Sequence, residues 1–203
     1  AGSGGTIQNT STRGAEFVSA AQVNLTAMNF TNAATADFPA APTGLSTGVN
    51  TADNAAVHLQ YVTQATLDRV SITGSAEHGI NGHFVTDFVL SNSTLTTNGN
   101  GPDEDGIHFF NMLGTSAITN TAVATSGDDN INIQNNTNLT QAGFGSTLTL
   151  NITNGSANGG VLGSGYLMGI RGTSTATVTV AGVTADNNFS GGVVIDTFDT
   201  ATS

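Results

Sequence analysis

A short pattern of turn residues and alternating apolar residues returns six times along this chain of 203 residues. Each copy contains a Gly, Asp or Asn turn, an alternating strand, a Thr, Ser or Asn turn and a second alternating strand. Aligned on the first inward apolar residue, a loose early copy and six clear ones begin at Ala15, Val57, Ile80, Ile107, Ile131, Leu167 and Val193. The clear copies lie 23 to 36 residues apart, so each is too short to bury its own apolar face. The copies must therefore stack on one another.

The clearest copy shows how such a unit is built. A turn at Asp105-Gly106 leads into a strand at 107–111, whose first and third residues face inward. After a further turn, Ile118 and Val123 supply the next inward positions. Alternation with a period of two and one buried side is typical of strands, which we predict to be parallel and wound around an apolar interior.

The composition supports an all-β chain. Only 8% of the residues are charged and 37% are hydrophobic, while Gly, Ser, Thr and Asn supply most of the polarity and favour turns and strands. We predict a β-solenoid of about seven coils, with loop insertions at about 33–53 and 135–164. No shift in composition marks a second domain, so residues 1–203 are expected to form a single solenoid domain.

Two motifs carry a resemblance to a known family. The segments 105–109 (DGIHF) and 127–133 (GDDNINI) resemble the repeats of right-handed parallel β-helix proteins. Such repeats occur in pectate-lyase-like enzymes and in very large bacterial surface and adhesin-type proteins. The resemblance implies a right-handed parallel β-helix over nearly the whole chain, but this fold hosts many activities and does not specify one.

Charge and residue usage exclude several classes of function. The chain has 14 acidic residues against three basic ones, a net charge of -11, so it cannot neutralise a row of phosphates and nucleic-acid binding is not expected. It contains no cysteine and no apolar run long enough to cross a membrane, so neither disulfides nor membrane insertion is expected. We expect an extracellular or cell-surface protein.

Acidic residues gather at one turn of the predicted stack. Stacking places Glu77, Glu104 and Asp128 in one column and brings Asp105 and Asp129 together in the next. A ladder of carboxylates repels itself unless a cation neutralises it, and Ca²⁺ accepts such oxygen ligands in loose geometry. These five residues are the predicted calcium ligands; the alternative is that the side chains of these turns simply point into water.

The same acids also permit an enzymatic interpretation. The spacing of Asp105 from Asp128-Asp129 is similar to that of the aspartates of polygalacturonase-like glycosidases. However, the Gly-His-Gly segment of that family is missing, and its Arg-x-Lys motif has no match beyond Arg171. We therefore do not expect an enzyme. A polysaccharide hydrolase or lyase is kept as an alternative, ranked below the two functions described next.

A strip of polar side chains follows the outward side of the first strand of successive copies. Its proposed glycan-binding residues are His58, Asn81, His83, His108, Phe110 and Asn132. Imidazoles, amides and one exposed ring can bind a sugar by hydrogen bonds and stacking. The alternative is an ordinary solvated face of a sheet.

The two ends of the chain suggest assembly. Neither end shows an amphipathic cap, and uncapped strand ends invite pairing. The predicted assembly residues are Thr6, Ile7, Gln8, Val193, Ile195 and Phe198. We expect an extracellular structural protein that forms a fibre, a stalk or the body of an adhesin. Its expected partner is either a second copy stacked head to tail or a continuation of the same chain. The alternative is a glycan-binding module of a surface protein.

Overall fold

The computed structural model describes residues 4–36, 54–136 and 147–198. In these residues the secondary structure is all β: it comprises 18 strands, and every pairing between them is parallel. The expected fold class, an all-β chain with parallel strands, is thereby confirmed. None of the described residues belongs to a helix that is long and apolar enough to cross a membrane.

The strands form three ladders, here called sheets A, B and C. Sheet A runs in the order β1 (Thr6–Gln8), β4 (Asn29–Thr31), β7 (Ser71–Thr73), β10 (Thr94–Thr96), β12 (Ala122–Ala124) and β15 (Ser156–Asn158). Sheet B runs in the order β2 (Ala15–Val18), β5 (Ala55–Val62), β8 (His78–Thr86), β11 (Ile107–Thr119), β13 (Ile131–Asn136), β16 (Tyr166–Arg171) and β18 (Val193–Phe198). Sheet C contains β3 (Val23–Thr26), β6 (Ala65–Asp68), β9 (Phe88–Ser91), the second half of β11, β14 (Thr147–Thr153) and β17 (Thr175–Ala181).

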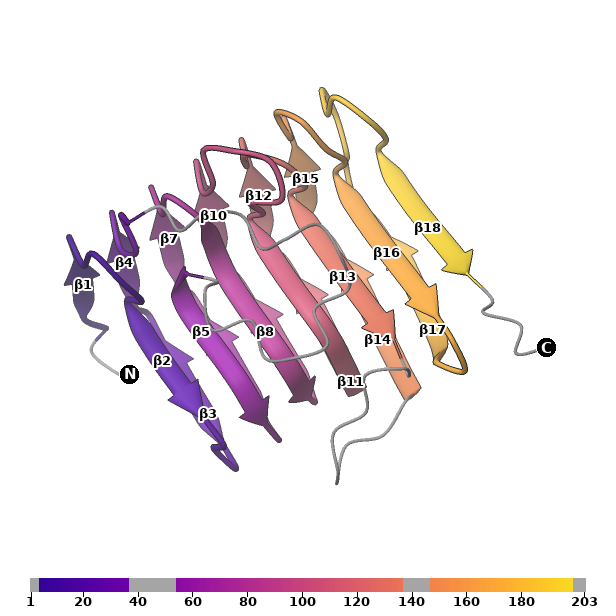
Figure 1. Ribbon diagram of the computed structural model, residues 1–203, viewed down its shortest axis with the longest axis horizontal. Coiled ribbons are helices and arrows are strands. Elements are labelled where there is room, and N and C mark those ends of the chain that lie inside the picture. Colours follow the sequence, from indigo (N-terminus) through magenta and orange to yellow (C-terminus); the bar gives the residue numbers. More distant parts are fainter. Residues whose placement is uncertain (1–3, 37–53, 137–146, 199–203) are drawn as a thin grey trace.

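The chain passes through the sheets in the order B, C, A and then begins again, as β2, β3, β4 and then β5, β6, β7 show (Figure 1). One such passage is called a rung below. Each strand pairs with the strand one rung earlier and one rung later, so residues about one repeat apart in sequence become direct neighbours. The stack, rather than the order along the chain, therefore decides which side chains meet.

The pairing register agrees with the sequence alignment at all copies but one. Val57, Ile80, Ile107 and Ile131 lie opposite one another in sheet B. The next residue in this column is Tyr166, not Leu167 as expected. Tyr166 and Met168 point into the core and are 1% exposed, whereas Leu167 faces outward. Three consecutive apolar residues leave the phase of the alternation open, and packing of the tyrosine ring decides it.

The core is a set of apolar columns that run along the stack. In sheet A, Ile72, Leu95 and Val123 lie on successive strands and are fully buried. Between the sheets, the rings of Phe88 and Phe109 pack with their centroids 4.6 Å apart. Burying such a side chain contributes about 1.5–3 kcal/mol to the free energy of folding. Because every rung supplies some of these side chains, the stabilisation is distributed along the whole stack.

Single residues with left-handed backbone conformation turn the chain between sheets. The turn from sheet C to sheet A uses one such residue in each rung, with φ between 48° and 63°: Ala27, Arg69, Asn92, Asn120, Asn154 and Gly182. The turn that ends sheet A uses another set: Asn9, Asn32, Gly74, Thr97, Thr125 and Gly159. Gly and Asn adopt this conformation most readily, and they occupy eight of these twelve positions.

One of the two expected insertions is narrower than the sequence suggested. In the second, 135–164, the strands β14 and β15 continue sheets C and A in regular register. The extra length of this rung is therefore not one continuous loop. The alternating apolar residues of β14 form a regular strand within it. In the first, residues 33–36 are described and bond to the segment 10–11, while 37–53 and 137–146 lie outside the described residues.

Candidate functional site

A cleft of about 410 Å³ lies along β11, β13 and β16 on the outer side of sheet B. It combines acidic, amide, aromatic and basic side chains. Its lining residues are Asp103, His108, Phe110, Asp128, Asp129, Asn132, Gln134, Asn136, Leu167 and Arg171. They come from three successive rungs, so the cleft exists only because the rungs stack.

Asp105 does not line the cleft, but it bonds to three of the residues that do. Its side chain is fully buried, and its carboxylate accepts three hydrogen bonds. The backbone N–H of Asp129 donates to Oδ1 at 2.9 Å, while Nδ1 of His108 and Nδ2 of Asn132 donate to Oδ2 at 2.6 and 3.2 Å. A buried carboxylate with this many donors is held in one position.

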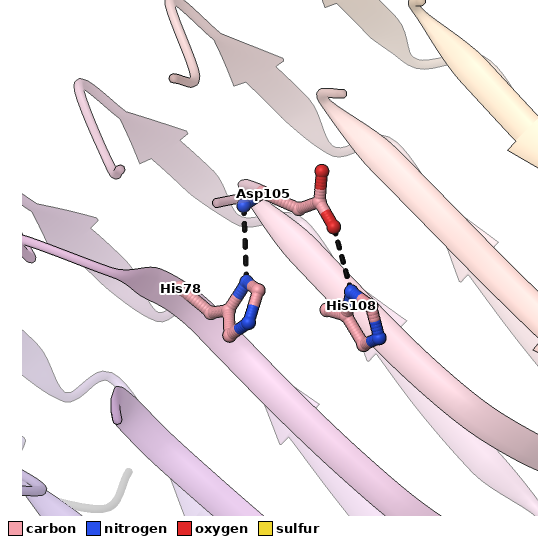
Figure 2. A group of neighbouring side chains, drawn as sticks. All are labelled: His78, Asp105 and His108. Atoms are coloured by element: carbon pink, nitrogen blue, oxygen red, sulfur yellow. Dashed lines mark hydrogen bonds and ion pairs between the residues drawn. The ribbon is translucent and has the colours of Figure 1, made fainter. Parts of the chain in front are cut away.

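Two imidazoles lie on either side of Asp105, as Figure 2 shows. The backbone N–H of Asp105 donates to Nδ1 of His78 at 3.0 Å, so this nitrogen is an acceptor. On the other side, Nδ1–H of His108 donates to the carboxylate, which leaves Nε2 as the acceptor nitrogen of that ring. The ring centroids are 4.7 Å apart. Asp105 thus fixes opposite roles for the Nδ1 atoms of two neighbouring histidines.

Two further acids lie next to this group. Burial, followed by the nearby Asp105 carboxylate, raises the pKa of Asp129 from 3.8 to about 7, although Ser164 N–H donates to Oδ1 of Asp129. Burial also raises the pKa of Asp128, which accepts a hydrogen bond from the N–H of Asp103. Perturbed carboxyl groups in a cleft are typical of functional sites.

The predicted calcium ligands divide into two groups. The side chains of Asp105, Asp128 and Asp129 offer oxygens that all lie within 4.8 Å of one another. Glu77 and Glu104 point elsewhere: the first accepts the N–H of Asn54, and the second accepts the backbone amides at 100 and 101. Those glutamates hold turns in place, so the residues able to share a cation are the three aspartates.

A second group with metal-ligating side chains consists of His78, Asp105 and His108, whose ligand atoms also lie within 4.8 Å. A metal-bound histidine usually donates its other N–H to a carboxylate or carbonyl. His108 fits this pattern, but Nδ1 of His78 accepts a hydrogen bond. The hydrogen bonds therefore suit an oriented histidine better than a site with two histidine ligands.

The predicted glycan strip is only partly open. The register places His58, Asn81, His108 and Asn132 opposite one another, as expected. However, His58 and Asn81 are 0% exposed and His83 is 5% exposed. His108, Asn132 and Phe110 line the cleft. The accessible part of the strip therefore belongs to the later rungs.

Sequence reasoning missed three features of the site. Arg171 lies at the end of β16, opposite Asn136, and lines the same cleft as the acids although it shares no column with them. Leu167 enters the lining because the register is one residue from the expected one. The approach of His78 to His108 joins two different columns, and no column alignment can reveal it.

The predicted assembly residues lie at opposite ends of the stack and in different sheets. Thr6, Ile7 and Gln8 form β1 at one edge of sheet A, and Val193, Ile195 and Phe198 belong to β18 at the far edge of sheet B (Figure 1).

Comparison of the chain with protein-family models, with curated proteins and with solved structures finds no match.

Proposed function

We propose that this chain is a right-handed parallel β-helix of about seven coils that serves as the body of an extracellular or cell-surface protein and binds polysaccharide in the cleft of sheet B. The repeated passage through three parallel sheets supports the architecture. The small fraction of charged residues permits close packing of polar surfaces, and the absence of cysteine makes the body insensitive to the redox state of its surroundings.

The observation that carries the binding function is the composition of the cleft. Phe110 offers an apolar ring, Asn132 and Gln134 offer amides, and His108 offers an acceptor nitrogen that Asp105 holds in place. Sugars present both apolar ring faces and hydroxyl groups, so such a mixture matches their chemistry. The cleft follows the stacking direction across three rungs, which suits an extended chain better than a small compact ligand.

Binding can be tested on a glycan array followed by calorimetry with the best neutral and acidic polysaccharides. Phe110→Ala and Asn132→Ala should each weaken binding about tenfold, whereas Thr73→Ala on the outer side of sheet A should leave it unchanged. Absence of binding to every polysaccharide by the folded chain would contradict the proposal. Release of reducing ends that is lost in Asp128→Asn and Asp129→Asn would instead favour the hydrolase alternative.

Calcium is the cation that we propose for the three aspartates. Bringing Asp105, Asp128 and Asp129 together in a partly buried place is unfavourable unless protons or a cation neutralise them. Excess Ca²⁺ should therefore raise the melting temperature relative to chelator, and Asp128→Asn should reduce this difference. An equal melting temperature in calcium and chelator would count against the site.

A further inference from the structure

The apolar core is only half covered at its two ends. At the first end the partly buried residues that pack against the core are Ile7, Ala15, Phe17, Ala20, Leu25 and Met28. At the other end they are Ala176, Val178, Val180, Val183 and Ala185. On β18, the last described strand of sheet B, Val193 and Ile195 are 46% and 50% exposed. Strand edges that also expose apolar side chains favour pairing with another strand.

The two ends of sheet B carry matching columns. Ala15 and Phe17 of β2 begin the columns that continue through Val57 and Leu59 in the pairing register. Followed to the far end of the sheet, the same columns finish at Val193 and Ile195 of β18. A second molecule placed beyond β18 would therefore set Ala15 on Val193 and Phe17 on Ile195, with the parallel pairing used throughout the sheet.

Sheet A fits the same placement. Ile7 begins a column that reaches Ala157 of β15. The segment after β17 adds one more level, because Thr184 bridges to Ser156, which brings Ala185 next to Ala157. The β1 strand of a second molecule would continue this sheet with Ile7 over Ala185. In sheet C the same placement leaves room for one strand between β17 and β3.

Charges at this joint are sparse and do not oppose one another. In the shared register Glu16 would lie opposite Val194, and Asp196 opposite Val18. Glu16 already pairs with Arg13 of its own molecule. Directly opposed like charges, which destabilise a strand pair, are thus avoided in a molecule with a net charge of -11.

We propose that a second copy of this chain docks head to tail, with its β1 and β2 edge on the β18 end of the first. The inference rests on the proposed β-helix architecture and is independent of the glycan cleft. Because the two surfaces differ, the contact is heterologous and each added copy exposes a new free end, so it produces filaments rather than closed dimers.

The test uses one blocking substitution at each end of the chain. Ile195→Lys blocks the β18 end, and Phe17→Lys blocks the β2 end, so the two blocked ends carry like charges and cannot pair with each other. Val89→Lys, an outward residue in the middle of sheet C, is the matched control. Size-exclusion chromatography with light scattering should show concentration-dependent oligomers for the unchanged chain and for the control. Each blocked variant should be monomeric, with association weakened at least tenfold because a charge would be buried without a partner.

Mixing the two blocked variants distinguishes a head-to-tail joint from other contacts. Each retains one intact end, so an equimolar mixture should form dimers and nothing larger. The proposal is overturned if the unchanged chain is monomeric at all concentrations, if the blocked variants assemble as it does, or if the mixture stays monomeric. Circular dichroism and glycan binding should be unchanged in both variants, which separates a failed joint from a failed fold or a failed cleft.

Discussion

The carboxylate of Asp105 lies 2.6 Å from Nδ1 of His108, three residues further along the chain. The aspartate is fully buried, whereas the histidine reaches the cleft. Asp105 therefore connects the interior of the stack to the proposed binding surface, and it fixes which histidine nitrogen a ligand meets.

Asp105→Ala should lower the free energy of unfolding by about 3 kcal/mol, because three donors lose their buried acceptor. Chemical denaturation measures this loss. Asp186→Ala, at an exposed aspartate, is the control and should change stability by less than about 0.5 kcal/mol. A loss no larger than that of the control would show that the network contributes little.

Asp129→Asn should stabilise the protein at neutral pH. Because the pKa of Asp129 is about 7 in the folded chain and 3.8 ordinarily, the folded state holds the extra proton between these values. Its contribution to the free energy of unfolding is thus full below about pH 4 and is lost as the pH rises through 7. The variant should be more stable than the unchanged chain by about 2 kcal/mol at pH 8, and little different at pH 4.

Thermal unfolding across this pH range, in chelator so that no cation contributes, checks the prediction. If the melting temperature of the variant falls with rising pH in parallel with that of the unchanged chain, a group other than Asp129 causes the pH dependence.

Gly82→Ala should destabilise the chain by about 2 kcal/mol. Gly82 lies opposite Phe109 in sheet B, and a Cβ added there would collide with the phenyl ring. Adding Phe109→Leu should recover part of the loss, since a smaller side chain leaves room for the methyl group. Melting temperatures of the two single variants and the double variant measure the coupling, and strict additivity would contradict the contact.

Thr125→Gly should stabilise the chain by about 1 kcal/mol. Thr125 is exposed and has φ 57°, a conformation that costs a β-branched residue more than glycine. The same turn position holds Gly74 and Gly159 in other rungs. Thr94→Gly, at the first residue of β10, is the control and should destabilise the chain by a similar amount. Equal signs for the two changes would show that backbone strain is not the cause.

The sequence predicted the stack well because the repeats carry two independent signals. Alternating apolar residues gave the phase of Ile80, Ile107 and Ile131, and the turn residues marked where each strand ends. At Tyr166 the turn residues 163–165 were present, but three apolar residues in a row made the alternation ambiguous. The predicted register was wrong by one residue there, because without alternation the sequence does not show which side chains face inward.

The site was harder to predict because its contacts depend on directions of side chains. The alignment of the repeats predicted that Asp105 and Asp129 are neighbours, because each lies two residues before the first inward residue of its copy. It could not show that Glu104 bonds to its own turn, or that Arg171 reaches the cleft from the far end of β16. Such details follow from rotamers and turn shape, which spacing along the chain does not encode.

The one-residue corners have a consequence for how such a molecule can change during evolution. Each rung leaves and re-enters the sheets at the same corner positions, so a duplicated or deleted gene segment that encodes a whole rung preserves every later register. A shift of one residue would instead turn the apolar side outward in all strands that follow. Selection can therefore alter the length of the molecule in whole steps, while the chemistry displayed on a given face is free to diverge.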